Sequence, residues 1–508
     1  MDGYALSCHA RTIFNPVRSI VFPDVGANEK SLFRFVRARV GFGGSTMRFT
    51  FAESHAGMLL FDKLTTTASL HIQRARMALA RPLPARKIFQ RRRVALVSWA
   101  FPPDSSSSAH FPKAIAEVAS RVPVDLTVVC APAPGTMTAQ GLEMLSSLPA
   151  SLRILRAPGA VDDKNDPASR PVFRVMPSLD GGFDTAILMA ATAMRGFGEA
   201  VPDVVLAAGP RFSNFLAARY LAKWSRAKLV LFYMDEWGVQ TPPFVNASAS
   251  DRKWEGRCLE SADAVCYVTK GKRAVYESAY PSLRTKPSYI CPNGWDATAF
   301  AKARYGTHHL QGFSGKFCIS FVGSAAEHAP IGPFLAALDQ VLCMRRDFRD
   351  TVKLVLVGNQ PETVRSQIAA FSARHQGVVH LLAAVPQSEA IEIMRESSAL
   401  LLLNTCRYEG IVPQKTYDYL NVATPILAYG ATGGAAPLVT DAQAGIAVAE
   451  LTRAALEDAL DILIQTPKKH WDNQVRRTHA QNFNRQALAK GLLEFLLHLD
   501  HETTSKAI

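Results

Sequence analysis

The sequence lacks long hydrophobic runs, paired cysteines and a recognisable leader segment. No window of 18 consecutive residues is apolar, so we expect no membrane-spanning helix. The first residues contain no basic start followed by an apolar core, so we expect no secretory signal. The eight cysteines stand singly, with no C-x-x-C pair and no histidines at zinc-ligand spacing. This usage favours reduced, buried thiols and a cytoplasmic protein.

Several short motifs of nucleotide and metal enzymes are also absent. There is no Walker A sequence and no H-E-x-x-H. The glycines at 41, 43 and 44 follow no convincing strand, and Gly430–Gly434 lacks the spacing of a dinucleotide fingerprint. No Asp-x-Asp pair is present to hold a metal-bound nucleotide diphosphate. We therefore expect neither a cofactor nor a metal, and any bound diphosphate must be neutralised by backbone N–H groups and lysine.

What is present is a repeated alternation of short apolar strands and helical stretches. A chain of 508 residues is too long for a single core, so two large domains are expected. Strands alternating with helices predict an α/β fold with doubly wound parallel sheets, each with one binding edge at the carboxyl ends of its strands. The expected strands are Val94–Trp99, Val124–Cys130, Leu152–Leu155, Val204–Ala208, Leu229–Tyr233, Ala264–Val268 and Ser288–Cys291, and then Phe317–Val322, Lys353–Val357, Val378–Leu382 and Ala399–Leu403.

Two runs of this alternation, separated by a glycine-containing stretch, set the expected domain limits. We expect a basic N-terminal extension over 1–93, an acceptor domain over 94–295, a linker over 296–316, a nucleotide-sugar domain over 317–470 and C-terminal helices that pack back over 471–508. Both sheets are expected to be Rossmann-like. Two binding edges suit an enzyme that joins two substrates.

The positive charge of the chain is concentrated in the N-terminal extension. Residues 1–93 hold 16 Lys+Arg against 5 Asp+Glu, a net charge of +11, whereas residues 94–508 hold 41 against 38, a net charge of +3. Near the end of the extension, spaced apolar residues alternate with arginines, and the last three residues are Arg91, Arg92 and Arg93. The extension either contacts an anionic membrane surface or is a poorly ordered leader without a partner. Nucleic acid is the least favoured partner, because no aromatic residues interleave with the basic ones.

The stretch from Glu409 to Leu420 is the most informative segment for function. It follows the apolar run Ala399–Leu403 and reads as a strand, a loop and a helix N-terminus, which presents free N–H groups and the positive end of a dipole. Lys415 adds a full charge, and Asp418 lies one helical step further on the same face. A diphosphate suits the lysine and N–H groups, and ribose hydroxyls suit the carboxylate. The alternative is an ordinary αβ unit in which Lys415 and Asp418 form a surface ion pair.

The edge of the first predicted sheet carries polar residues that suit an acceptor. A serine loop follows its first strand, and His110 comes just after it as a candidate base; the alternative is a capping or packing histidine. Two acids follow the strand at Leu229–Tyr233 and either orient acceptor hydroxyls or form a solvated loop pair. The residues concerned are Ser105, Ser106, Ser107, Ser108, Asp235 and Glu236.

These residues, in this order, resemble the GT-B glycosyltransferases of the large retaining family 4. The resemblance covers roughly residues 94–500 and rests on VALVSWAFPPD, on the stretch Pro202–Trp237, on Trp254–Asp296 with its Pro-Asn-Gly, on FVGS at Phe321–Ser324, and on the P-x-K-x-x-[DE]-Y-L pattern ending at Leu420. The extension before Val94 lies outside it.

The resemblance implies roles for individual residues. Asp418 falls where this family places the second acid of its E-x7-E motif, which holds the ribose of the donor. The first acid belongs at Gly410, but the nearest acid is Glu409, one residue away. Lys415 resembles a lysine that neutralises the diphosphate, and the basic pair that many members carry after the FVG strand is missing. The expected donor site comprises Gly323, Ser324, Glu409, Gly410, Ile411, Val412, Lys415 and Asp418, with Lys415, Asp418 and His110 as the catalytic candidates.

The resemblance implies a cytoplasmic, metal-independent hexosyltransferase that retains anomeric configuration. Its donor is a nucleotide sugar, and its acceptor is a glycan or a lipid-linked intermediate of polysaccharide or glycoconjugate biosynthesis. A basic extension would suit a peripheral position on the inner face of a membrane. Two alternatives remain open: a GT-B nucleotide-sugar epimerase, and a catalytically weak GT-B scaffold that binds a glycan or a partner protein.

The charge distribution generates a test of the extension. Each basic residue near an anionic surface contributes about 1 kcal/mol, and salt screens this attraction within a Debye length of about 8 Å. We expect the full chain to bind anionic vesicles and to dissociate in high salt, and a chain of residues 94–508 not to bind, as measured by vesicle co-sedimentation. Equal binding by both forms would exclude the extension as the anchor. Tighter binding to nucleic acid than to vesicles would favour nucleic acid as the partner of the extension.

Overall fold

The computed structural model consists of two units that are described separately. The first comprises Met1–Leu79 with Asp163–Pro177, and the second comprises Ala80–Asp162 with Ser178–Ile508. The structure describes residues 20–21, 35–42, 45–52, 91–135, 137–158, 183–239, 247–306, 308–325, 329–404, 412–431 and 433–499.

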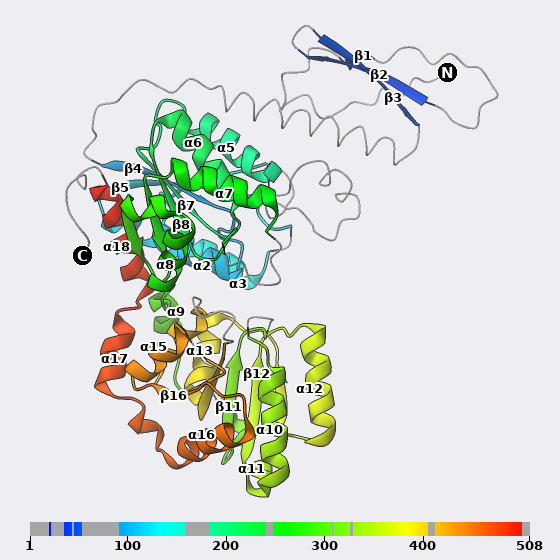
Figure 1. The fold of residues 1–508 in the computed structure, drawn as a ribbon, viewed down its shortest axis with the longest axis vertical. Coiled ribbons are helices and arrows are strands. Elements are labelled where there is room, and N and C mark those ends of the chain that lie inside the picture. Colours follow the sequence, from blue (N-terminus) through cyan, green and yellow to red (C-terminus); the bar gives the residue numbers. More distant parts are fainter. Residues whose placement is uncertain are drawn as a thin grey trace, which may run out of the picture. The chain divides into compact units, whose positions relative to one another are not determined.

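The first unit contains a three-stranded antiparallel sheet in the order β1–β2–β3 (Figure 1). The strands are β1 (Ile20–Val21), β2 (Phe35–Phe42) and β3 (Ser45–Ala52). Phe42 pairs with Ser45, so β2 and β3 form a hairpin. Gly41 therefore lies inside a strand, and the expectation that no strand precedes these glycines was wrong. Alternation of apolar residues with arginine in Phe35–Phe42 suits a strand with two different faces.

The second unit begins with a seven-stranded parallel sheet in the order β10–β9–β8–β7–β4–β5–β6. The chain leaves β4 in one direction towards β5 and β6 and later in the other direction towards β7, so the topological switch point lies between β4 and β7. Most of its central strand residues are buried, as expected for a sheet covered on both faces. The strands are β4 (Arg92–Ser98), β5 (Val124–Cys130), β6 (Arg153–Arg156), β7 (Val204–Ala208), β8 (Lys228–Tyr233), β9 (Ala264–Tyr267) and β10 (Ser288–Ile290).

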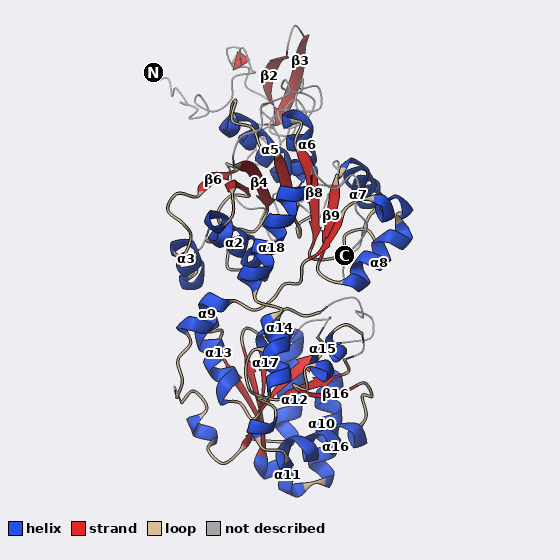
Figure 2. Ribbon diagram, turned by 90° about the vertical axis from the view of Figure 1, so that its left-hand side faces the viewer, coloured by secondary structure: helices blue, strands red, loops and turns tan. Residues whose placement is uncertain are grey.

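Helices lie on both sides of these strands (Figure 2). The helices between them are α2 (Ser107–Val118), α3 (Ala139–Ser146), α5 (Phe183–Phe197), α6 (Ser213–Ser225), α7 (Ala249–Ser261) and α8 (Lys270–Ala279), with short 3₁₀ turns at Ala119–Arg121 and Pro281–Thr285.

A second parallel sheet follows, with six strands in the order β13–β12–β11–β14–β15–β16. Its switch point lies between β11 and β14, which pair through Ile319 and Ala399. The two doubly wound sheets confirm the predicted fold class. The strands are β11 (Phe317–Val322), β12 (Val352–Val357), β13 (Val379–Leu382), β14 (Ala399–Leu403), β15 (Ile426–Tyr429) and β16 (Gly445–Val448).

The helices of this part include one that returns to the first sheet. Ala489, Leu492, Leu493 and Leu496 of the last helix are fully buried in the core formed by β4, β5 and β7, and that helix packs on α2. The helices are α9 (Ala297–Lys302), α10 (Gly332–Met344), α11 (Arg346–Thr351), α12 (Glu362–Arg374), α13 (Gln387–Glu396), α14 (Lys415–Leu420), α15 (Ala435–Asp441), α16 (Arg453–Gln465), α17 (Gln474–Gln481) and α18 (Arg485–His498), with 3₁₀ turns at Gln311–Phe313 and Lys468–His470.

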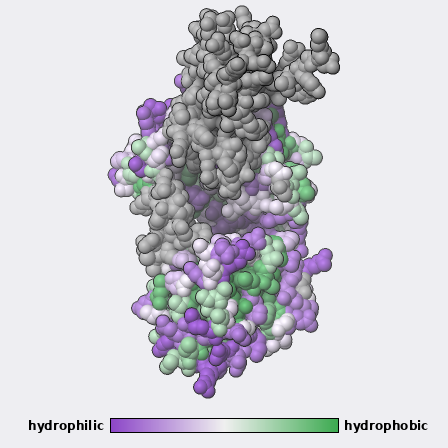
Figure 3. All heavy atoms as spheres, turned by 90° about the vertical axis from the view of Figure 1, so that its right-hand side faces the viewer, coloured by the Kyte–Doolittle hydropathy of each residue, from purple (hydrophilic) through white to green (hydrophobic). Residues whose placement is uncertain are grey.

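The outer surface of the second unit mixes hydrophilic and hydrophobic residues, as one face in Figure 3 shows. Among the large apolar side chains that are exposed, Tyr305 and Met344 are the most open to solvent, at 81% and 71%. Within the described ranges, no helix is both long enough and apolar enough to cross a bilayer.

Arg476 of α17 is a buried cation that holds the second sheet domain together from inside. Its guanidinium donates to the carbonyl oxygens of Tyr419 (2.6 Å), Leu420 (3.0 Å) and Thr424 (2.8 Å), and also to those of Trp471 and Ala444. Burial lowers the pKa of this side chain to about 10, so it remains charged at pH 7. The cation thereby satisfies carbonyls at the C-terminal end of α14, where a positive charge is favourable.

Replacing this cation by an apolar side chain should destabilise the domain. Arg476→Met leaves several buried carbonyls without donors, so we expect a loss of about 3 kcal/mol and a fall in melting temperature of about 5–10 °C, measured by calorimetry. Arg477→Met is the matched control, because Arg477 is 56% exposed and pairs with Asp472 at the surface. Its effect should stay under about 1 kcal/mol. Similar melting temperatures for both variants would contradict the role of Arg476.

Candidate functional site

Two tight turns close the carboxyl edge of the second sheet beside α14. Gly323 directly follows β11 and Gly358 directly follows β12, both with positive φ (115° and 121°), a backbone conformation that residues with a Cβ rarely adopt. Gln360 ties the turns together, since its amide nitrogen donates to the carbonyls of Gly323 (3.0 Å) and Gly358 (3.2 Å). The Ser324 hydroxyl donates to the Asn359 carbonyl and is exposed. A Cβ on Gly323 would lie 3.2 Å from Nζ of Lys415, so this glycine leaves room for the lysine.

Two tyrosines of α14 fix this helix to the edge of the sheet. The Tyr419 hydroxyl accepts the backbone N–H of Val322 at 2.9 Å, which joins the helix to the last residue of β11. Tyr417 is buried with Trp295 and Val412 in a small apolar cluster. Val412 therefore serves packing through its side chain. Lys415 and Asp418 are held at this edge as a result.

Lys415 is half-buried and its ammonium is desolvated. Nζ lies 3.6 Å from the ring centroid of Phe321, the residue that precedes the end of β11. No carboxylate of the described residues forms an ion pair with it. Burial lowers the pKa of Lys415 to about 7. A cation–π contact of this kind favours the charged form only weakly, and an incoming anion would supply a full counter-charge that no described residue provides.

Asp418 is buried and carries an unused hydrogen-bond acceptor. The side chain is 8% exposed, and its Oδ1 has no hydrogen-bond partner within the described part of the chain. Burial raises the pKa of Asp418 to about 7, with Arg485 opposing and Asp296 adding to the shift. No ion pair joins Asp418 to Lys415 among the described residues, so the alternative of a surface ion pair was wrong. A buried acceptor without a donor calls for a ligand that supplies one, and ribose hydroxyls have that chemistry.

Part of the expected donor site lies outside the described residues. Glu409, Gly410 and Ile411 fall in the stretch 405–411, and the segment after Ser324 falls partly in 326–328. Their predicted contacts with donor sugar and phosphate stay predictions.

The residues expected on the acceptor side have different surroundings from one another. Ser106 and Ser107 are exposed, Ser105 and Ser108 are half-buried, and all four lie at or just before the start of α2. Ser106 is the N-cap residue, and its side chain makes no capping hydrogen bond. The loop is therefore open to a ligand.

Asp235 and Glu236 do not form a solvated pair. Asp235 is exposed, whereas Glu236 is buried and forms an ion pair with Lys272, in which Nζ lies 3.1 Å from Oε1. Lys272 also donates to the carbonyl of Met234 at 2.8 Å. Glu236 thus fixes the loop after β8 through Oε1, while its buried Oε2 has no partner among the described residues, and Asp235 is the exposed acid of the two.

His110 has surroundings that suit a neutral imidazole. It is buried in α2, and burial together with Arg485 and Lys113 lowers its pKa to about 3, against an opposing effect of Asp296. An imidazole with this pKa is a weak base at pH 7. The structure thus gives no support to the expected role of His110 as base and favours packing, the alternative reading.

A buried carboxylate surrounded by tyrosines was missed by sequence reasoning. Glu255 of α7 is fully buried and accepts hydrogen bonds from the hydroxyls of Tyr276 (3.0 Å), Tyr280 (3.1 Å) and Tyr233 (3.3 Å), and from the N–H of Gly238 (3.2 Å). Burial raises the pKa of Glu255. This cluster fixes the loop after β8, because Gly238 of that loop donates its N–H to Glu255. Only the acid within an otherwise apolar helix face could have indicated it.

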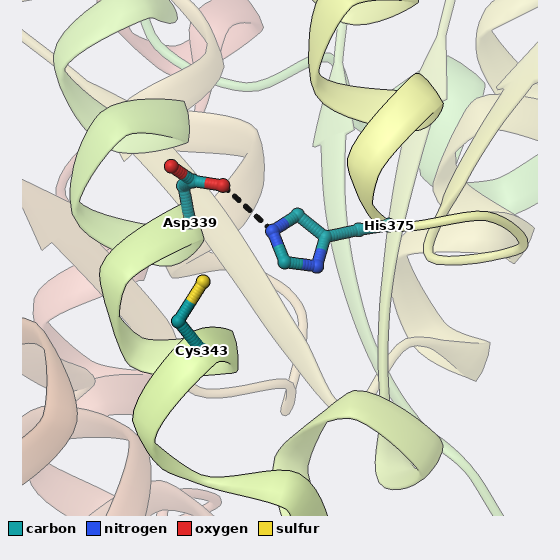
Figure 4. A group of neighbouring side chains, drawn as sticks. All are labelled: Asp339, Cys343 and His375. Atoms are coloured by element: carbon teal, nitrogen blue, oxygen red, sulfur yellow. Dashed lines mark hydrogen bonds and ion pairs between the residues drawn. The ribbon is translucent and has the colours of Figure 1, made fainter.

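Asp339, Cys343 and His375 are the one group of possible metal ligands among the described residues (Figure 4). Asp339 and Cys343 lie one turn apart on α10, and His375 follows α12. His375 Nε2 and Arg374 Nε both contact Oδ1 of Asp339, at 2.7 and 3.0 Å, and these contacts outweigh partial burial and lower the pKa of that carboxyl. Because α10 and α12 run against the strands, their C-terminal turns lie at the amino edge of the sheet. This group is therefore remote from the edge that carries Lys415 and Asp418.

Comparison with known proteins agrees with this geometry. Residues 316–466 match the family model described as glycosyl transferases group 1. An alpha-maltose-1-phosphate synthase of Mycolicibacterium smegmatis is 24% identical over 232 residues, which cover 42% of this chain and 57% of that relative. The chain thus spans little more than half the length of this relative.

Solved structures share the architecture at low sequence identity. The sucrose-phosphate synthase of Thermosynechococcus elongatus has a TM-score of 0.61 at 14% identity, covering 81% of this chain and all of that one. Anabaena HepE (Alr3699) in complex with UDP-glucose has a TM-score of 0.56 at 14% identity, covering 80% of this chain and 99% of that one. The chain therefore has a GT-B fold, as the resemblance implied, and similarity at this level of identity shows the fold alone.

The two shifted groups at α14 predict a pH optimum for nucleotide binding. Above pH 7 the free protein loses the charge of Lys415, and below pH 7 it protonates Asp418. Affinity for UDP should therefore peak near pH 7 and fall on both sides by up to about tenfold per pH unit, since one proton is linked on each side. Calorimetric titrations between pH 5.5 and 9 measure this.

Two substitutions separate the contributions of Lys415 and Asp418 to the pH dependence of UDP affinity. Lys415→Met should flatten the alkaline limb alone, and Asp418→Asn the acid limb alone. The titration of the nucleotide itself is common to all three proteins, so it cancels when the profiles are compared. Identical pH profiles for the wild type and both variants would exclude these residues as nucleotide contacts.

Proposed function

We propose that this chain, whose second sheet domain matches the group 1 glycosyltransferases, transfers a sugar from a nucleotide donor to an acceptor. The observation that carries the proposal is the pair at α14. Among the described residues, a desolvated lysine with no carboxylate partner and a buried carboxylate with an unpaired acceptor lie one helical step apart, at the carboxyl edge of the sheet and inside the matched region. The HepE structures in complex with UDP and UDP-glucose support a nucleotide sugar as donor.

The donor would be held by complementary chemistry at the two residues. Lys415 pairs with the diphosphate and takes up a proton when the anion arrives above pH 7, because the counter-charge raises its lowered pKa. The ribose hydroxyls donate to Asp418 Oδ1, which otherwise lacks a partner. A metal is not required in this scheme, because the lysine supplies the positive charge.

The same contacts would act on the reaction itself. The bond between the anomeric carbon and the diphosphate oxygen breaks, and negative charge grows on that oxygen. A fixed cation aimed at the growing charge stabilises the transition state more than the ground state. We propose retention by attack on the face from which the diphosphate leaves, with the acceptor hydroxyl passing its proton to the departing phosphate oxygen. This route needs no protein nucleophile and no base, which agrees with the low pKa of His110.

The acceptor would approach the edge of the first sheet. The open serine loop before α2 and the exposed Asp235 are the groups that can meet its hydroxyls. We propose a glycan or a lipid-linked intermediate as acceptor and a hexose as the transferred sugar. In this scheme the enzyme is cytoplasmic, and its basic extension places it at the inner face of a membrane.

Turnover of nucleotide sugars tests the proposal. UDP-, GDP- and ADP-sugars are offered to the protein in excess EDTA, and release of the free nucleoside diphosphate is measured. We expect turnover with one of these donors, unaffected by EDTA, and a fall in kcat of about 10²–10³ in Lys415→Met, the loss typical of one transition-state contact.

The control and the contradicting outcomes separate the alternatives. Lys490→Met should match the wild type, because Lys490 is an exposed lysine paired with Glu494 on α18. A strict need for Mg²⁺ or Mn²⁺ would overturn the account of charge neutralisation. Nucleotide binding without any turnover would favour the scaffold, and interconversion of the sugar without release of the diphosphate would favour the epimerase.

A further inference from the structure

Trp99 and Arg211 stand at the topological switch point of the first sheet, a place that the donor site does not use. Trp99 directly follows β4, and Arg211 follows β7 by three residues. The two strands are neighbours, and their last paired residues are Ser98 and Ala208. Crevices outside a switch point are where open α/β sheets bind ligands.

Arg211 is held in place by an aromatic ring and has hydrogen-bonding capacity to spare. Its guanidinium carbon lies 4.4 Å from the ring centroid of Trp99, which is buried. Nη1 of Arg211 is buried and, among the residues that the structure describes, has no hydrogen-bond partner; no described carboxylate pairs with the side chain. Arg476 and Arg485, which are buried whereas Arg211 is half-buried, instead donate to several carbonyl oxygens each. Arg211 has no such partners among the described residues, so support of the fold does not explain its position.

The start of α6 adds positive potential at the same position. Its N-cap residue Phe212 makes no side-chain capping bond, and the first turn contains no acid. Ser213 and Asn214 are fully buried, and no described residue forms a hydrogen bond with the Ser213 hydroxyl or with Asn214 Oδ1. Asn214 donates from Nδ2 to the carbonyl of Ala208 at 2.9 Å, which fixes the turn. A 13-residue helix therefore begins here with its dipole uncompensated and with unused polar groups beside Arg211.

The turn is rigid, so these groups are positioned before any ligand arrives. Phe212 stacks on Trp237 with ring centroids 5.4 Å apart and an interplanar angle of 4°. Trp237 is itself held through its indole N–H, which donates to Asp251 at 3.2 Å, and through its backbone N–H, which donates to the Tyr276 hydroxyl at 3.0 Å. Preorganised donors gain affinity because little ordering is left to do on binding.

We propose that Arg211, held on Trp99 at the start of α6, binds an anionic group of the acceptor, a phosphate or a carboxylate. The planar guanidinium offers paired donors that match either anion, and a neutral sugar would leave its charge without a counter-ion. This inference rests on the proposed function, because it assigns the acceptor to the first sheet. Lys415 and Asp418 occupy the edge of the other sheet and already account for the donor.

Binding of small anions to single variants tests the assignment. The probes are inorganic phosphate, glucose 6-phosphate, glucuronate and glucose, measured by calorimetry, with UDP as a separate titration. The wild type should bind the anionic probes more tightly than glucose, and the ranking of phosphate against carboxylate identifies the anion. Arg211→Gln should weaken their binding by about 10- to 100-fold, the range of a charge-assisted pair, and leave UDP affinity unchanged. Arg211→Lys should retain part of the affinity.

Arg257→Gln is the matched control. Arg257 also lies over a tryptophan, with its guanidinium carbon 5.0 Å from the ring centroid of Trp254, but it is exposed on α7. This variant should bind every probe as the wild type does. The proposal is overturned if the wild type binds none of the anions or binds glucose equally well, if Arg211→Gln binds them unchanged, or if UDP affinity falls in that variant. A last outcome concerns the donor site. If the protein does not bind UDP, but Arg211→Gln still loses the anion binding of the wild type, the proposed donor site is wrong and the anion site at Arg211 is supported.

Discussion

A buried ion pair between Asp296 and Arg485 joins the parts of the second unit on which the candidate site depends. Nη1 of Arg485 lies 3.3 Å from Oδ2 of Asp296, and both side chains are almost inaccessible to solvent. Oδ1 of Asp296 also caps α9 by accepting the N–H groups of Thr298 and Ala299, and Gln486 donates to the same oxygen at 3.0 Å. Arg485 further donates to the carbonyls of Asn293 and Gly294. The segment that leaves the first sheet is thereby tied to the helix that returns to it.

This pair is costly to bury, and its surroundings compensate for that cost. Two ions taken out of water lose several kcal/mol of solvation each, which is recovered only when their remaining donors and acceptors are satisfied. Here the hydrogen bonds described above satisfy these donors and acceptors, and Lys113 adds a second cation 4.0 Å from Asp296. Burial alone would raise the pKa of Asp296, but Arg485 and Lys113 hold it below its ordinary value. The same charges act on neighbours: Arg485 lowers the pKa of His110 and opposes the rise at Asp418.

The sequence predicted the sheets well and the chemistry of single side chains poorly. Phe317–Val322 and Ala399–Leu403 were predicted at their observed limits, because a short apolar run between polar residues can hardly be anything but a buried strand. The edge strand β16 was missed, since Gly445–Val448 is short and only partly buried. Gly294 shows a residue type whose reason appears only in the fold. It has φ of 66°, and a Cβ there would lie 2.5 Å from the carbonyl oxygen of Phe483.

The errors at the site share one physical cause, which is that burial depends on residues far away in the sequence. The spacing of Lys415 and Asp418 also allowed a surface ion pair, but Phe321 and Gly323, more than ninety residues earlier, lie against Lys415. Glu236 and Asp235 are neighbours of equal charge, and only contact with Lys272 makes one of them structural. Nothing in the local pattern of either pair carries this information.

The most direct test of the account is a crystal structure of the protein grown with UDP, or with whichever nucleoside diphosphate binds. The account predicts density for the nucleotide at the carboxyl edge of the second sheet, with a phosphate oxygen within about 3 Å of Lys415 Nζ and a ribose hydroxyl donating to Asp418 Oδ1. A nucleotide bound elsewhere on the chain, or bound here with the phosphates turned away from Lys415, would contradict it.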